Sequence, residues 1–304
     1  MVYTLGETTY DIIFKNGKPI DSKIGGSTLN TSISLGRLGV KPAFVSELGY
    51  DQLGRMSLEF LKENGVQTQF VQIFEGNSRV ALAFLDASSN ASYSFYQASG
   101  KISAFQWPEL NTNDVILFGS SFATKDENRS SLISFLQKAK DLGVTIIYDP
   151  NFRKGNLDSN PMLKQKIMEN IQLATIVKGS DEDFFHIWGS NDPAFAYGKI
   201  KDLGCENLIY TASYKGAWLF SGSLIKTFDV PVIVPVSTIG AGDNFSAGII
   251  YTIEKLRKIG IQLADFTEKQ WAEVIQNSIC FSQHVCMHFD NYLSVEFASR
   301  FYIS

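Results

Sequence analysis

Hydrophobic positions along the chain change their spacing in a regular order. Short apolar runs of strand length alternate with longer stretches in which apolar residues recur every three or four positions, the spacing of an amphipathic helix. From residue 114 onward, the pattern predicts strands at 114–119, 144–149, 174–178, 207–212 and 217–221, with helices at 126–142, 161–172, 181–188 and 193–203. This alternation predicts an α/β fold with a mainly parallel sheet covered by helices on both faces.

The N-terminal third contains a second kind of pattern. Residues 2–6 and 41–48 are predicted strands, and residues 27–39 and 51–64 are predicted helices. The stretches 68–76, 79–86 and 91–97 are instead rich in β-formers and partly alternating, and Asn16-Gly17 is typical of a hairpin turn. We therefore predict one α/β domain over 1–304, with a small antiparallel sheet inserted as a lid from segments 12–26 and 68–99.

Composition narrows the class of protein. The 304 residues are 44% hydrophobic and 19% charged, with a formal net charge of −4, which disfavours nucleic-acid binding. No apolar run approaches the roughly 20 residues of a membrane span, and no signal segment opens the chain. The three cysteines form no CxxC pair, and their odd number favours a reducing cytoplasm over a disulfide framework.

Polar residues cluster where several predicted strands end. The segment 149–153 follows one strand, 178–183 follows the next, and Thr211 and Gly216 follow a third. Because ligands of parallel α/β sheets bind beyond the carboxyl ends of the strands, these segments are candidates for a site.

The segment Ser237-Thr238-Ile239-Gly240-Ala241-Gly242-Asp243 lies between an extended apolar run, 230–236, and a predicted helix. Glycines at a helix N-terminus let backbone N–H groups approach an anion. Asp243 is then either a base that takes a proton from an attacking hydroxyl or a cap of its own helix. The local sequence leaves both open. It also leaves open whether Gly25-Gly26, before an earlier helix, is a ligand-contacting hinge or a plain turn. No GxxxxGK[ST] segment is present, which excludes a P-loop.

Two segments together resemble the ribokinase/PfkB family of carbohydrate kinases. The first is Gly240-Ala241-Gly242-Asp243, and the second is Gly25-Gly26 with Asn30, which precedes a Leu-Gly-Arg-Leu-Gly stretch. They occur in the family's order, about 210 residues apart (positions 30 to 240), with the predicted lid between them. The resemblance implies a ribokinase-like three-layer α/β/α fold.

The resemblance also implies roles in phosphoryl transfer. Asp243 matches the family's catalytic base, and the backbone amides of Gly240, Ala241 and Gly242 match its anion hole. Asp11 matches a carboxylate that accepts hydrogen bonds from sugar hydroxyls.

Further positions match the substrate side of the family's site. Gly25, Gly26 and Asn30 match the sugar pocket and its hinge. The segment Asp149-x-Asn151-x-Arg153 resembles the version in fructokinases and 2-keto-3-deoxygluconate kinases, where the Asn and Arg lie near substrate and phosphate.

The nucleotide side is matched by a separate set. The resemblance implies ATP as phosphoryl donor with Mg²⁺, which Asp183 would hold indirectly. The residues expected near the nucleotide are Lys178, Ser180, Thr211, Ser213, Gly216 and Asn277, beside Gly240 and Gly242.

Three positions depart from the family pattern. The metal-linked Asn-x-x-Glu is Ser180-x-x-Asp183 here, and the Asp that commonly opens the GAGD segment is Ser237. Together with Asp290 and Asn291 near the end of the predicted site, Ser237 puts activation by K⁺ in doubt.

The expected function is therefore that of a cytoplasmic, ATP-dependent sugar kinase, with fructose as substrate and fructose 6-phosphate as product. Ribose, 2-keto-3-deoxygluconate and nucleosides are the alternatives within the family. A catalytically weak protein that senses sugar or nucleotide is the alternative from another class, motivated by the three departures. A homodimer formed through the lid is expected, because an exposed sheet with apolar alternation needs a covering partner.

Overall fold

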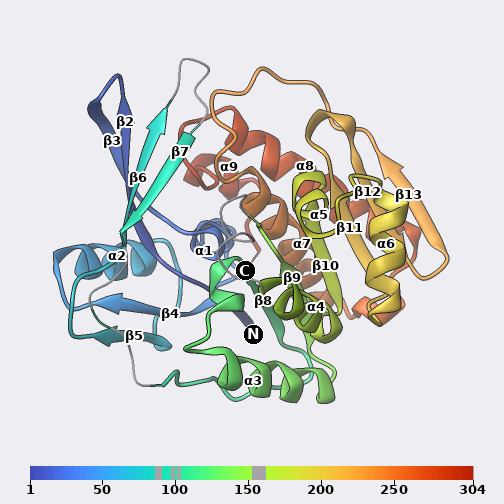
Figure 1. Cartoon of the computed structure of the whole chain (residues 1–304). Helices are drawn as coiled ribbons and strands as arrows, with labels where there is room; N and C mark the ends of the chain where they lie inside the picture. Colours follow the sequence, from blue (N-terminus) through green and yellow to red (C-terminus); the bar gives the residue numbers. More distant parts are fainter. Residues whose placement is uncertain (86–90, 97–99, 101–103, 153–161, 304) are drawn as a thin grey trace.

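The computed structural model describes residues 1–85, 91–96, 100, 104–152 and 162–303. Two sheets organise this part of the chain, a large one of nine strands and a small one of four. Figure 1 shows helices on both sides of the large sheet and the small sheet rising at the upper left. The described residues form the predicted three-layer α/β/α arrangement with a small second sheet.

The large sheet has the strand order β13-β12-β11-β10-β9-β8-β1-β4-β5. In this spatial order, all strands from β11 across to β5 pair in parallel. At the other edge, β12 and β13 pair antiparallel. Because the parallel strands point the same way, their carboxyl ends share one edge. The bounds are β1 (Val2–Leu5), β4 (Ala43–Gly49), β5 (Val71–Phe74), β8 (Val115–Gly119), β9 (Thr145–Asp149), β10 (Ile176–Ser180), β11 (Asn207–Thr211), β12 (Ala217–Ser221) and β13 (Leu224–Phe228).

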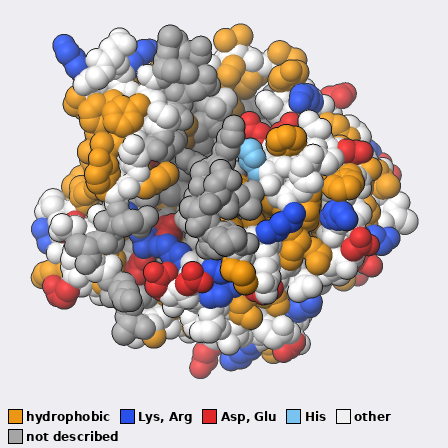
Figure 2. Space-filling model, viewed as in Figure 1, with side chains coloured by type: hydrophobic (Ala, Val, Ile, Leu, Met, Phe, Trp, Pro, Cys, Tyr) orange, Lys and Arg blue, Asp and Glu red, His pale blue; other side chains and the backbone are white. Residues whose placement is uncertain are grey.

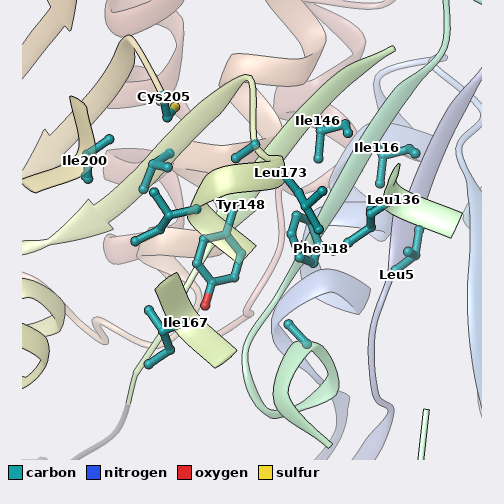
Figure 3. Packing of buried hydrophobic residues seen from close by; sticks show 14 of the residues in the cluster. Leu5, Ile116, Phe118, Leu136, Ile146, Tyr148, Ile167, Leu173, Ile200 and Cys205 are labelled. Carbon is teal, nitrogen blue, oxygen red and sulfur yellow. The ribbon is translucent and has the colours of Figure 1, made fainter. Parts of the chain in front are cut away.

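Each face of this sheet buries a different set of helices. One face packs against α3 to α6, and Figure 3 shows Phe118 and Tyr148 of the sheet beside Leu136 and Ile167 of α3 and α4. The other face packs against α1, α7, α8 and α9. The bounds are α1 (Ser27–Arg37), α2 (Gln52–Glu63), α3 (Arg129–Asp141), α4 (Leu163–Leu173), α5 (Asp181–Trp188), α6 (Pro193–Asp202), α7 (Ala241–Lys258), α8 (Glu268–Cys286) and α9 (Val295–Ser299), with short 3₁₀ turns η1 (Ser121–Thr124), η2 (Ser213–Lys215) and η3 (Leu263–Asp265).

The small sheet, which we call the lid, consists of β2 (Thr9–Lys15), β3 (Lys18–Gly25), β6 (Val80–Leu85) and β7 (Ala91–Tyr96). Its order is β3-β2-β6-β7. The β2–β3 and β6–β7 pairs are antiparallel, and β2 and β6 join them in parallel. Asn16 and Gly17 have positive φ angles of 52° and 73°, as the predicted hairpin turn requires.

One stretch differs from the sequence-based expectation, and a second, the extended apolar run, joins neither sheet. Residues 68–76, expected in the lid, contain β5, which pairs in parallel with β4 at the edge of the large sheet and buries Phe74. The apolar run 230–236 forms no strand, and Val232 and Val234 are 84% and 87% exposed. A short apolar run favours an extended backbone, but it does not specify which sheet the segment joins. Strand pairing depends on contacts between residues distant in sequence. Lid residues 86–90 and 97–99 lie outside the described residues.

None of the helices in the described ranges is long and apolar enough to cross a bilayer.

Candidate active site

Asp243 lies in the first turn of α7 and is only 9% exposed. Its carboxylate accepts a hydrogen bond from Ser27 Oγ at 2.6 Å and one from Asn30 Nδ2 at 2.8 Å, both from α1. Thr31 Oγ1 also donates to the Asp243 carbonyl at 2.9 Å. No side-chain bond caps α7, whose N-cap residue is Gly240. The helix-cap alternative is therefore wrong, and the carboxylate is held toward a neighbouring helix.

Burial raises the pKa of the Asp243 carboxyl above its ordinary value. The bonds from Ser27 and Asn30 and the charge of Lys178 oppose this shift, and the negative charge of Asp149 reinforces it. A carboxylate with a raised pKa is a stronger base than an exposed one, which suits it to accept a proton from a hydroxyl.

The turn before Asp243 is built for close backbone approach. Gly240 has φ 82°, the left-handed conformation, and a Cβ there would lie 2.5 Å from the Asn291 carbonyl oxygen. A Cβ on Gly242 would lie 3.0 Å from Lys178 Nζ. The first N–H groups of a helix have no intrahelical acceptor, so this turn directs donors and the positive end of the helix dipole to one place.

A buried ion pair supports the same turn from the large sheet. Lys178 Nζ donates to Asp149 Oδ2 at 2.8 Å, and Ser246 Oγ of α7 donates to the same oxygen at 3.0 Å. Lys178 and Asp149 are 4% and 5% exposed. Burial alone would lower the pKa of Lys178, but the charge and hydrogen bond of Asp149 raise it, so the ammonium stays charged. Asp149 Oδ1 is buried and has no hydrogen-bond partner among the described residues.

Asp183 lies at the start of α5 with both carboxylate oxygens bonded within the protein. Ser180 N and Ser180 Oγ both donate to Asp183 Oδ2 at 2.7 Å, and the Phe152 N–H donates to Oδ1 at 2.5 Å. Ser180 and Asp183 thus form a capping box at the start of α5. Burial and the charge of Asp149 raise the pKa of Asp183. Because both oxygens are already bonded within the protein, the indirect contact of Asp183 with a metal ion stays a prediction.

Asp11 and Gly25 face each other within the lid. Thr9 Oγ1 donates to Asp11 Oδ1 at 2.7 Å, and a Cβ on Gly25 would lie 2.5 Å from Asp11 Oδ2. Gly26 has φ 132°, and a Cβ there would lie 2.3 Å from the Glu7 carbonyl oxygen. Both glycines are therefore required by close packing at the junction of β3 and α1. This junction connects Asp11 in the lid to Ser27 and Asn30 beside Asp243.

A cluster of four charged side chains lies over the ends of β1 and β4, and we call it the charged cluster. Arg79 pairs with Glu7 at 3.1 Å and with Glu47, and Lys125 pairs with Glu7 and lies 3.9 Å from Glu47. Burial opposes ionisation of Glu7, but Lys125 and Arg79 hold its pKa below the ordinary value. Figure 2 shows acidic and basic side chains gathered below the lid on this face. The two acids and two bases cancel in charge.

The residues expected near the nucleotide come from several elements. Ser180 and Thr211 are paired neighbours on β10 and β11, and Thr211 Oγ1 donates to the Gly179 carbonyl at 3.4 Å. Ser213 and Gly216, in the turn after β11, have positive φ angles of 50° and 127°. Asn277 donates from α8 to Thr252 Oγ1 of α7 at 3.0 Å, so it joins the two helices.

Two predicted residues lie at the boundary of what the structure describes. Asn151 has φ 41°, an uncommon value for a residue with a side chain, just after β9. Arg153 lies outside the described residues, so its expected place near the phosphate stays a prediction.

Sequence reasoning missed Ser27, Ser246 and the charged cluster. Ser27 was expected only to begin a helix, but it binds Asp243 across 216 positions of sequence. Ser246 follows Asp243 by three residues, which places it near the same face of α7. The three-residue spacing from Asp243 to Ser246 is therefore a signal in the sequence. The pairing of Glu7 with Arg79 and Lys125 has no such signal, because these residues are far apart along the chain.

Comparisons with known proteins give related sequences and related folds. The model of the pfkB family carbohydrate kinases matches residues 1–268. The chain is 30% identical over 244 residues to fructokinase-2 of Solanum lycopersicum, covering 75% of this chain and 72% of the relative. Fructokinase of Vibrio cholerae O395, solved with fructose, ADP and calcium, has a similar fold with TM-score 0.86 at 19% identity, covering 99% and 98% of the two chains. Aminoimidazole riboside kinase of Salmonella enterica, solved with its riboside and an ATP analogue, gives TM-score 0.81 at 21% identity, covering 99% of each chain.

Proposed function

Because the chain belongs to the pfkB family of carbohydrate kinases, we propose that it transfers the γ-phosphate of ATP to the primary hydroxyl of a small neutral sugar, with Asp243 as base. Fructose, giving fructose 6-phosphate, is the proposed substrate. The observation that carries the proposal is the setting of Asp243. Its buried carboxylate is fixed by Ser27 and Asn30 directly beside the glycine turn at the start of α7.

The proposed step moves the γ-phosphoryl group of ATP onto the sugar hydroxyl. The sugar hydroxyl loses its proton to Asp243, its oxygen forms a bond to the γ-phosphorus, and the bond to the bridging oxygen of ADP breaks. Negative charge develops on the transferred group and on the ADP oxygen. The backbone amides of Gly240, Ala241 and Gly242 stabilise the negative charge on the transferred phosphoryl group, because they lie at the helix N-terminus.

The site fits ATP with Mg²⁺. The cradle beside Gly242 is shaped by a missing Cβ and carries the Lys178 ammonium. The orphaned oxygen Asp149 Oδ1 would hold the metal ion or its water, and Asp183 would contribute through water. Mg²⁺, when bound, neutralises phosphate charge and orients the phosphates. Among the described residues, no group of three or more His, Cys, Asp and Glu side chains gathers as a metal site of its own.

A neutral sugar is favoured over a sugar phosphate by the charged cluster. A phosphate at the far end of the substrate would need unpaired basic side chains. The two nearby bases, Arg79 and Lys125, are already neutralised by Glu7 and Glu47. Binding a phosphate there would break partly buried ion pairs, which is unfavourable.

Fructose is preferred over ribose, 2-keto-3-deoxygluconate and nucleosides because a relative that is 30% identical to this chain is named a fructokinase. A riboside is the second candidate, since the Salmonella enterica structure with a riboside has the same fold. We further propose a cytoplasmic enzyme, in agreement with its three free cysteines, Cys205, Cys280 and Cys286.

A coupled assay of ADP release across a panel of sugars tests the proposal. The panel contains fructose, ribose, 2-keto-3-deoxygluconate, a nucleoside and fructose 6-phosphate. We expect the highest kcat/KM with fructose and at least about a hundredfold lower value with fructose 6-phosphate, the effect of about 3 kcal/mol. Sugar binding by calorimetry without turnover on any sugar would instead support the sensing alternative.

A further inference from the structure

Lys23 links the lid to the segment 289–293, which contacts the turn at Gly240. Its side chain is only 9% exposed although it starts from β3 of the lid. The Nζ atom donates to the carbonyl oxygen of Phe289, a residue 266 positions away, and lies 3.7 Å from Asp290 Oδ1 and 3.5 Å from Asp21 Oδ2. A nearly buried ammonium is costly unless it is paired, so these contacts fix where it rests.

Within the lid, Lys23 lies opposite Asp11, the carboxylate expected to bind the sugar. Lys23 is paired directly with Asp11 across β2 and β3. Directly paired residues in an antiparallel pair project from the same face of the sheet. The Lys23 side chain therefore leaves the lid on the face that also carries Asp11, and this face meets Gly25.

On the other side, the segment 289–293 is attached to the turn that opens α7. The Asn291 carbonyl accepts a hydrogen bond from Asn244 Nδ2 at 2.8 Å and lies where a Cβ on Gly240 would be, at 2.5 Å. The Leu293 N–H donates to Ser34 Oγ of α1 at 3.0 Å, and Ser34 Oγ donates to Asn244 Oδ1 at 2.5 Å. The segment 289–293 is thus in direct contact with the residues around the Gly240 turn.

We propose that Lys23 is a positioning residue that couples sugar binding under the lid to the geometry of the nucleotide-binding turn. Sugar contacts at Asp11 hold β2 and β3 in place, Lys23 then holds Phe289 and Asp290, and Asn291 holds Gly240 in its left-handed conformation. The proposal rests on the proposed function, because it assigns the sugar to Asp11 and the nucleotide to the Gly240 turn.

The first test needs no ligand. In Lys23→Met, amide hydrogen exchange at Leu293 and at Ser22–Ile24 should be at least about tenfold faster than in the wild type, because the tie between lid and segment is lost. Lys18→Met is the matched control, since Lys18 is an exposed lysine on the same strand. Unchanged exchange at Leu293 in Lys23→Met overturns the proposal, whatever the enzyme phosphorylates.

The second test measures coupling between the two ligands. The Kd of Mg-ADP is measured by calorimetry with and without saturating fructose, or the best sugar of the panel. In the wild type we expect sugar to tighten ADP binding by about fivefold or more. In Lys23→Met this ratio should fall to within about twofold of one, whereas Lys23→Arg should keep most of the coupling.

The outcomes separate the two proposals. Retained coupling in Lys23→Met, or no coupling in a wild type that turns over sugar, overturns the role of Lys23. A wild type without turnover on any sugar contradicts the proposed function, and hydrogen exchange then decides the role of Lys23 by itself.

Discussion

Asp243 combines two properties that oppose each other in solution. A base must be deprotonated to act, yet burial favours its protonated form. Here Ser27 and Asn30 donate to the two carboxylate oxygens and keep the charged form accessible, while burial holds the pKa above its ordinary value. The carboxyl therefore has a proton affinity closer to that needed at neutral pH than an exposed Asp would have.

The pH dependence of kcat/KM follows from this shift. The base works when deprotonated, so activity falls as the pH drops through its pKa in the free enzyme. Because that pKa is raised, the acid limb should lie above the ordinary Asp value of about 4. Asp149→Asn removes a like charge from the surroundings of Asp243, so the limb of this variant should move to lower pH. A wild-type profile that stays flat down to pH about 4 would contradict the assignment.

At the residue scale, the sequence predicted those positions whose chemistry is local. The Gly240–Asp243 segment announces a helix N-terminus with an acid in its first turn, and the Gly25-Gly26 pair announces a tight junction. The direction of the Asp243 carboxylate, toward α1 and away from its own helix N-terminus, is not a local property. It depends on Ser27 approaching from α1, which no spacing within α7 can reveal.

The same limit applies at the scale of elements. Helices and strands with strong periodicity were predicted closely, and α5 (181–188) and β12 (217–221) have the predicted bounds. The sheet to which β5 belongs and the exposed course of 230–236 were not predicted. Both depend on long-range packing, because a run of valines or isoleucines does not specify which strand it pairs with.

The close packing of α7 on α8 gives a prediction at this scale. A Cβ on Gly248 would lie 2.4 Å from the Ser278 Cα, a backbone atom that cannot move aside alone. Gly248→Ala should lower the free energy of unfolding by about 1–3 kcal/mol through overpacking. Urea denaturation measures this change.

Gly198→Ala is the matched control, because Gly198 lies within α6 and a Cβ there meets no atom within 4 Å. It should stabilise the protein by about 0.5–1 kcal/mol, since alanine is the better helix former. Equal effects of the two substitutions would refute the close approach of α7 and α8.

At the scale of the whole molecule, the lid carries exposed apolar side chains that a second copy would cover. Ile20 and Phe84 are 56% and 39% exposed, and Figure 2 shows hydrophobic side chains gathered over the lid at the upper left. We therefore propose a homodimer joined through the lids.

Light scattering coupled to gel filtration tests this assembly. The wild type should have about twice the chain mass of 33.8 kDa, and Phe84→Glu should shift it toward the single-chain mass. Phe195→Glu is the control, because Phe195 is 42% exposed on α6, away from the lid. A wild type of single-chain mass at all concentrations would exclude the lid-mediated dimer.

The role of Asp243 as base is tested most directly by Asp243→Asn. An Asn side chain has nearly the same shape but cannot take the sugar proton. Calorimetry should give nucleotide and sugar affinities within a fewfold of the wild type, while kcat falls by about a hundredfold or more. A kcat near that of the wild type would show that Asp243 positions the helices and does not remove the proton.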